Sequence, residues 1–377
     1  MSQLCRAAAG AGAIAIACGT ALAHPGHVHP ETRPDQKPLV VAQAGDAAAP
    51  SVAKGVTGQG DLVFKVLHTS AALPEAAHAG LNAAHGGFAV DRRPGKGEVY
   101  FALPNVGIIR ISADLNTIEV LPTDGEMAAT NMHNTTIWYA DGDKTYLTFP
   151  GNATNKVYTT TADGALVDTL DAPTADTAFD NETVSAYFDN PENKFVPTDV
   201  EVLDNRFYVA TGYSSLDFVL TADVETESGV SSEWAPFAFG GKGDGPGQFG
   251  TGHGITVDPA GNITVADRPN SELESFTKDG AFLGTLPLPK GSLPCDVDYQ
   301  SGYTVVGCLK GPDENLGAPI YIVKDGEVVS TIMIKEDLGL EKFTHIHNAV
   351  MVERDGTFYI IAQAWNPGDF AILEQVK

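Results

Sequence analysis

The chain has 377 residues, of which 43% are hydrophobic and 19% are charged. This composition is typical of a soluble globular protein with a large core and excludes a wholly disordered chain. The 48 acidic residues outnumber the 23 basic ones, which gives a formal net charge of −25. Because such a chain repels phosphate backbones and anionic lipid surfaces, we expect no nucleic-acid partner, and a small molecule or a peptide is the expected substrate.

Residues 1–23 have the features of an export signal. Arg6 precedes an alanine-rich apolar stretch that is too short for a membrane anchor, and the small residues Ala21 to Ala23 predict cleavage after Ala23. Cys18 offers a lipoprotein alternative, but the residues before it match such a cleavage site poorly. No later segment has the long apolar run of a transmembrane helix. We therefore expect a periplasmic or secreted protein.

The next segment, residues 24–60, is rich in histidine, proline and alanine. Little of this stretch can be buried, so the composition predicts a flexible linker between the signal and a folded domain over residues 61–377.

The folded domain shows an internal repeat. Each unit has a short alternating run, a turn at glycine or aspartate, and a second alternating run. Six such units begin at His85, His133, Pro197, His253, Pro294 and His347. A spacing of roughly fifty residues predicts an all-β, six-bladed β-propeller whose blades are four-stranded antiparallel sheets.

The ends of the domain predict how the ring closes. The last unit has room for only three strands before Lys377, whereas "DLVFKVL" from Asp61 is a strand without a blade of its own. Pairing this N-terminal strand with the last blade would remove two exposed sheet edges.

Histidine recurs at one register of the repeat. In a propeller, the innermost strand of each blade lines the central channel, and its first residues converge near the axis. Four of the six units carry histidine there: His85, His133, His253 and His347. Imidazoles from separate blades meeting at one point predict a site for a transition metal, with zinc the first expectation and iron or copper the alternatives. His345 is expected on the same side of its strand as His347, so it is an alternative ligand.

The other two units carry aspartate at this register, Asp199 and Asp296, which we interpret as turn and capping residues.

The unit that begins at Pro294 also contains two cysteines. Cys295 and Cys308 flank a predicted hairpin turn at Gln300 to Gly302, which places them nearly opposite each other. In an exported protein this arrangement favours a cross-strand disulfide.

The stretch "PTDVEVLDNRFYVATGYSS", followed by "FAFGGKGDGPGQFGTGHGITVDPAGNITVADRPNSELESFTKDGAFLG", resembles the NHL-repeat propellers. In particular it is similar to the peptidyl-α-hydroxyglycine α-amidating lyase family, which cleaves a carbinolamide N–C bond to release a peptide amide and glyoxylate. The similarity is best over residues 195–284.

The resemblance implies a set of functional residues. The zinc-binding histidines of the family match His133, His253 and His347. Its proposed catalytic base matches Tyr213, and the arginine of its DR segment, which contacts the substrate, matches Arg268; a further substrate-binding arginine of the family, in the first blade, has no counterpart. A structural calcium ion in the channel is also implied by the family.

Two other functions stay open. Since the family has no histidine at the position of His85, a four-histidine site for iron or copper would indicate an oxidoreductase. A non-catalytic propeller that binds a protein or a glycan is the third interpretation, because the fold does not specify a chemistry.

Overall fold

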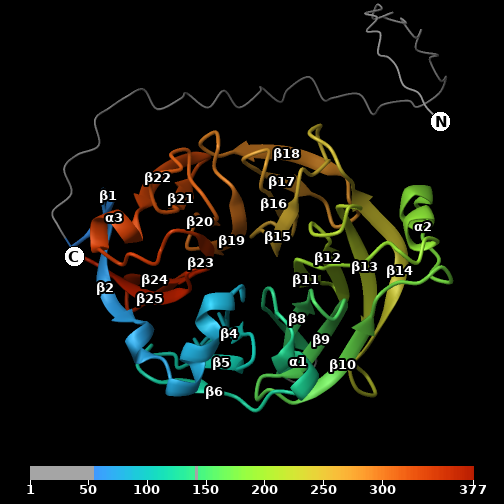
Figure 1. The fold of residues 1–377 in the computed structure, drawn as a ribbon, viewed down its shortest axis with the longest axis horizontal. Helices are drawn as coiled ribbons and strands as arrows, with labels where there is room; N and C mark the ends of the chain where they lie inside the picture. The colour runs from blue at the N-terminus through green and yellow to red at the C-terminus, as the bar shows by residue number, and fades with distance from the viewer. Residues whose placement is uncertain (1–54, 141–142) are drawn as a thin grey trace, which may run out of the picture. The chain divides into compact units, whose positions relative to one another are not determined.

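The computed structural model describes residues 55–377 except 141–142. These residues form six antiparallel sheets arranged as the blades of a ring (Figure 1). Five sheets have four strands and the sixth has five. The predicted six-bladed propeller is therefore confirmed. Within the described residues, no helix is long and apolar enough to cross a membrane.

The elements follow the chain around the ring. Blade 1 consists of β3 (Ala89–Val90), β4 (Val99–Leu103), β5 (Gly107–Ile111) and β6 (Ile118–Val120). Blade 2 consists of β7 (Thr136–Ala140), β8 (Lys144–Gly151), β9 (Lys156–Thr161) and β10 (Leu166–Asp171). Blade 3 consists of β11 (Asp199–Leu203), β12 (Arg206–Ala210), β13 (Phe218–Glu225) and β14 (Ser231–Gly240). Blade 4 consists of β15 (Gly252–Val257), β16 (Ile263–Asp267), β17 (Glu272–Phe276) and β18 (Phe282–Pro287). Blade 5 consists of β19 (Pro294–Gln300), β20 (Tyr303–Cys308), β21 (Ile320–Lys324) and β22 (Glu327–Ile332). Blade 6 consists of β23 (Ile346–Arg354), β24 (Thr357–Ala364) and β25 (Asp369–Gln375), to which β2 (Leu62–Thr69) and β1 (Thr57–Gln59) are added.

Short helices connect the strands. They are the 3₁₀ segments η1 (Ser70–Ala72) and η2 (Glu75–Ala83) and the α-helices α1 (Gly125–Ala129), α2 (Glu182–Phe188) and α3 (Ile334–Leu338). The first strand of each blade is the innermost one, and these strands contact one another in sequence from β3 and β7 to β19 and β23. Their first residues therefore meet at the axis of the ring, as the repeat predicted.

The ring closes through the two ends of the domain. Strand β2 pairs with β25, from Phe64 opposite Gln375 to Thr69 opposite Ala371, which confirms the predicted closure. Strand β1 pairs with β2 and lies within residues 24–60, the stretch predicted to be a linker. Because β2 comes from the N-terminal end of the domain, the last blade depends on residues about 300 positions away in sequence.

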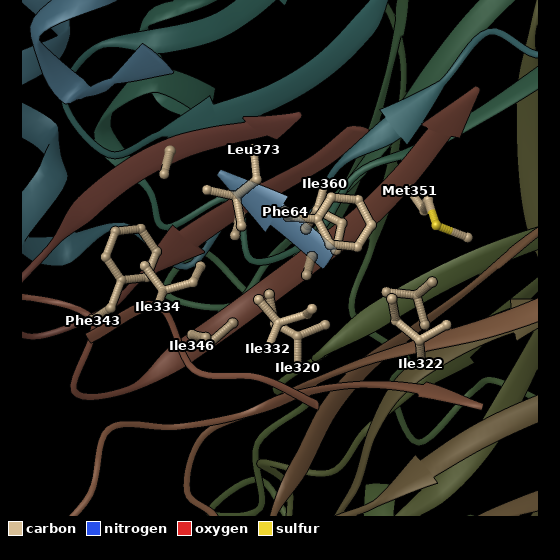
Figure 2. Close-up of a cluster of buried hydrophobic side chains, with 14 of the residues drawn as sticks. Phe64, Ile320, Ile322, Ile332, Ile334, Phe343, Ile346, Met351, Ile360 and Leu373 are labelled. Atoms are coloured by element: carbon tan, nitrogen blue, oxygen red, sulfur yellow. The ribbon is translucent and has the colours of Figure 1, made fainter. Parts of the chain in front are cut away.

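Apolar side chains between neighbouring blades form the core. Between blades 5 and 6, Ile320 and Ile322 of β21 contact a cluster that includes Phe64 of β2 and Ile360 of β24 (Figure 2). These four side chains are fully buried. Close packing of this kind holds the inner strands, and the residues at their entrances, in fixed positions.

Candidate metal centre

Three imidazoles converge on the axis. His133 precedes β7, His253 lies in β15 and His347 lies in β23, so they come from blades 2, 4 and 6. One ligand nitrogen from each lies within 4.8 Å of the others, and the ring centroids are 4.7 to 4.9 Å apart. All three side chains are buried, with at most 2% exposed. The structure thus brings together three of the four histidines that the repeat predicted as ligands.

Backbone carbonyls orient two of these rings. The Nδ1 of His133 lies 2.6 Å from the carbonyl oxygen of Thr198, and the Nδ1 of His253 lies 2.6 Å from that of Cys295. Because a carbonyl only accepts, each Nδ1 carries the proton and each Nε2 presents its lone pair. The approach of blade 5 to His253 requires glycine at position 254, where a Cβ would lie 2.6 Å from the Cys295 oxygen.

Burial keeps the three histidines neutral. It lowers the pKa of His133, His253 and His347 well below the usual value, and the positive charge of Arg268 lowers all three further. Neutral imidazole is the form that binds metals. The donor set, its tight spacing and its burial therefore fit a borderline transition metal such as zinc, with a fourth position left for water or substrate.

Tyr213 and Arg268 lie beside this group. Tyr213 is in the loop between β12 and β13, and Arg268 directly follows β16. The phenol oxygen of Tyr213 is 3.1 Å from Nε2 of His253, and Nη1 of Arg268 donates to that oxygen at 2.9 Å. Arg268 also reaches Nε2 of His347 at 3.4 Å. The two residues that the family resemblance singled out are thus in contact with each other and with the histidines.

The pKa of Tyr213 is raised, chiefly by burial, although Arg268 lowers it in part. Tyr213 is therefore a phenol near neutral pH, and in this structure it donates to His253 rather than acting as a base.

His85 stands next to the group but is not one of its three members. Its ring centroid is 4.8 Å from that of His347 and 5.4 Å from that of His133, and its Nδ1 lies 3.0 Å from the carbonyl oxygen of Ala83. Burial lowers its pKa to about 4. Two residues later, Gly87 packs against Asn134, where a Cβ would lie 1.2 Å from the side-chain oxygen. Whether His85 binds the metal stays a prediction.

His345, the alternative ligand, lies outside the three-histidine group. Its Nδ1 is 3.2 Å from the carbonyl oxygen of Asn366, and its ring centroid is 5.9 Å from that of Trp365. It precedes the first residue of β23, so the alternation of that strand does not direct it toward the axis as it does His347.

A polar layer follows the histidines along the channel. A cavity of about 130 Å³ is lined by residues of all six blades, including Asp199, Glu201 and Asp296. The two oxygens of Asp199 accept hydrogen bonds from the backbone N–H groups of Val200 and Ile255, each at 2.7 Å. Asp199 therefore links blade 3 to blade 4, in agreement with its interpretation as a structural residue.

Sequence reasoning missed two members of this layer, Asn134 and Asn348. The side-chain nitrogen of Asn348 donates to the side-chain oxygen of Asn134 at 3.2 Å and also to Asp296. Each asparagine directly follows a histidine of the metal group, so the repeated His-Asn pair was the signal that could have identified them.

The predicted disulfide is not formed in this structure. Cys295 and Cys308 are both free and buried. The register between β19 and β20 shifts at this point, so Cys308 is opposite Pro294 and the next pair is Asp296 with Gly307. This bulge leaves Cys295 without a partner directly opposite, and its sulfur accepts from Nη2 of Arg268 at 2.9 Å instead. A regular hairpin register was therefore the wrong assumption.

Comparison with known proteins gives structural neighbours only. No family model matches the chain, and a search of curated proteins found no match. Among solved structures, virginiamycin B lyase from Staphylococcus aureus covers 79% of this chain and 98% of its own, at 15% identity and a TM-score of 0.47. The gluconolactonase XC5397 from Xanthomonas campestris covers 85% and 91%, at 12% identity and a TM-score of 0.49. At these values the likenesses carry no functional information, and the NHL-repeat and amidating-lyase resemblance remains a hypothesis.

Proposed function

We propose that this chain is an exported, metal-dependent lyase that cleaves a carbinolamide N–C bond, as the amidating lyases do. The observation that carries the proposal is the convergence of three buried, neutral imidazoles from three blades with the Tyr213–Arg268 pair beside them. Export and a structural calcium ion are further parts of this proposal. Export rests on residues 1–23, which lie outside the described residues, and the calcium ion rests on the family resemblance.

The residues have distinct roles in the proposed reaction. His133, His253 and His347 would hold zinc, which supplies Lewis acidity to the hydroxyl group of the substrate. Arg268 presents a planar guanidinium suited to the carboxylate of an α-hydroxyglycine. Arg268 holds the hydroxyl of Tyr213 in place, and with Nε2 of His253 taken by zinc, Tyr213 would be free to give its proton to the substrate.

Metal analysis of the mature protein tests the proposal first. The protein is purified from the exported fraction without chelators or a histidine tag, beside the variants His253→Ala and His345→Ala. We expect one equivalent of zinc in the wild type and in His345→Ala, and none in His253→Ala. Release of glyoxylate from α-hydroxyhippurate then tests the reaction, and zinc without that activity would reject the lyase assignment.

A second candidate is an oxidoreductase with iron or copper bound by four histidines. The observation in its favour is the proximity of His85 to His347, with ring centroids 4.8 Å apart. Iron or copper in the wild type, lost in His85→Ala, would support it. A protein without stoichiometric metal would reject both enzymes and leave a ligand-binding propeller.

A further inference from the structure

Arg268 is a buried cation without an acidic partner. Its side chain is 8% exposed, and its hydrogen-bond partners are uncharged groups: the Tyr213 phenol, the Cys295 thiol and the His347 ring. Across residues 55–377, leaving aside 141–142, no salt bridge joins it to a carboxylate, and its buried Nε has no hydrogen-bond partner. Since buried charges in proteins are ordinarily paired, Arg268 is suited to bind an anion.

The unpaired charge of Arg268 acts on the metal group. Nη2 of Arg268 lies 3.4 Å from Nε2 of His347, one of the three nitrogens proposed to bind the metal. At this distance the positive charge of Arg268 opposes a divalent cation among the rings. An anion bound to Arg268 would cancel that charge at the place where the metal binds.

We infer that the site takes up its metal and a carboxylate ligand together, and that Arg268 couples the two binding events. The inference rests on the proposed metal function and goes beyond it, because it assigns Arg268 a role in metal affinity in addition to contact with substrate. The planar guanidinium fork suits a carboxylate, and its free Nε supplies a donor. Coupling between two ligands is reciprocal, so the metal strengthens carboxylate binding by the same factor.

The test measures zinc affinity of the metal-free protein by competition with a chromophoric chelator, in a constant sodium chloride background with or without acetate. Acetate should tighten zinc binding by about 5- to 150-fold, the usual range for coupled sites. Arg268→Gln should bind zinc more tightly than wild type without acetate and should lose the acetate effect. Arg268→Lys, which keeps the charge, should retain an acetate effect.

Arg92→Gln is the matched control. Arg92 is also near the axis, but it is paired with Asp298 at 2.6 Å and lines the separate polar cavity, so the acetate effect should be unchanged. Zinc binding that ignores acetate in the wild type would overturn the inference while leaving the metal site intact. An unchanged acetate effect in folded Arg268→Gln would also overturn it. Absence of zinc binding in the wild type would instead reject the proposed function, and this inference with it.

If Arg268→Gln does not fold, the wild-type protein still decides the question. Acetate binding measured by calorimetry with and without zinc must then show the same coupling factor as the zinc titration. Unequal factors, or acetate binding that is independent of zinc, would contradict the coupling.

Discussion

The phenol oxygen of Tyr213 lies 3.1 Å from Nε2 of His253, inside a chain of hydrogen bonds with one direction. Arg268 donates to Tyr213, Tyr213 donates to His253, and His253 donates through Nδ1 to the carbonyl oxygen of Cys295. The direction follows from the two ends, since a guanidinium only donates and a carbonyl only accepts. Blades 3, 4 and 5 thus share one hydrogen-bonded unit at the proposed metal centre.

Replacing Tyr213 with phenylalanine should separate its chemical role from its structural one. The ring stays, but Arg268 and His253 lose the hydroxyl between them. We expect unchanged zinc content and a loss of about 100-fold or more in kcat for glyoxylate release, the usual range for a residue that handles a proton.

Tyr139→Phe is the control for that variant. Tyr139 is 39% exposed, as is Tyr213, and its hydroxyl donates to Asp91 rather than to the metal group. It should keep wild-type kcat. Equal losses in both variants would show that the hydroxyl of Tyr213 has no specific part in the reaction. Loss of zinc in Tyr213→Phe would assign the hydroxyl to metal binding instead.

Much of this site was predictable because the fold repeats. Once six units were identified, the register placed His133, His253 and His347 on the axis, and the structure brings their rings together. The same argument applied to His85, whose ring lies beside the three-histidine group, with its centroid 4.8 Å from that of His347.

Other features depend on local geometry that repeat patterns do not contain. The turn predicted at Gln300 to Gly302 exists, with Ser301 and Gly302 both at positive φ. The bulge at the other end of the same hairpin has no such sequence signal, and it moves Cys295 out of register with Cys308 and toward Arg268. Contacts across the axis, such as that of Asn134 with Asn348, depend on how blades face each other.

The two buried cysteines should be free thiols in the mature protein. Alkylation in denaturant without reductant, followed by peptide mass spectrometry, should show a modified Cys295 and a modified Cys308. Recovery of a linked peptide that contains both would restore the disulfide predicted from the sequence. As the control, the number of alkylated cysteines is compared before and after reduction, and for free thiols it should not change.

The stability of the metal-free protein should depend on pH through Glu201, a carboxyl that lines the polar cavity. Burial raises the pKa of Glu201 to about 7, so the folded state holds a proton that the unfolded state releases above about pH 4. Stability from this group is therefore lost as pH rises from about 4 to 7. The neutral histidines act in the opposite direction, since unfolded histidine gains a proton below about pH 6.5.

Glu201→Gln tests this pH dependence. A glutamine has no proton to lose, and Thr256, whose hydroxyl now donates to Glu201 at 3.2 Å, can accept from the new amide. In the presence of a chelator, the melting temperature of the variant should exceed that of wild type at pH 8 and approach it at pH 4. Glu225→Gln, which removes an exposed carboxylate, should show no such difference. A Glu201→Gln variant less stable than wild type at pH 8 would contradict the expected sign.

The strand that closes the ring should contribute to the stability of the whole domain. Phe64 in β2 is fully buried against side chains of blades 5 and 6 (Figure 2). Leu67 in the same strand is 37% exposed. Phe64→Ala should lower the free energy of unfolding by about 3–5 kcal/mol, and Leu67→Ala should change it by about 0.5 kcal/mol or less. Chemical denaturation followed by tryptophan fluorescence measures both, because the three tryptophans lie in three blades: Trp365 in blade 6, Trp234 in blade 3, and Trp138 in blade 2, which Phe64 does not touch. Since closure joins the two ends of one ring, Trp138 should report the loss of stability together with the other tryptophans, in one unfolding transition. Equal effects of Phe64→Ala and Leu67→Ala would contradict the central place of Phe64 in the closing blade.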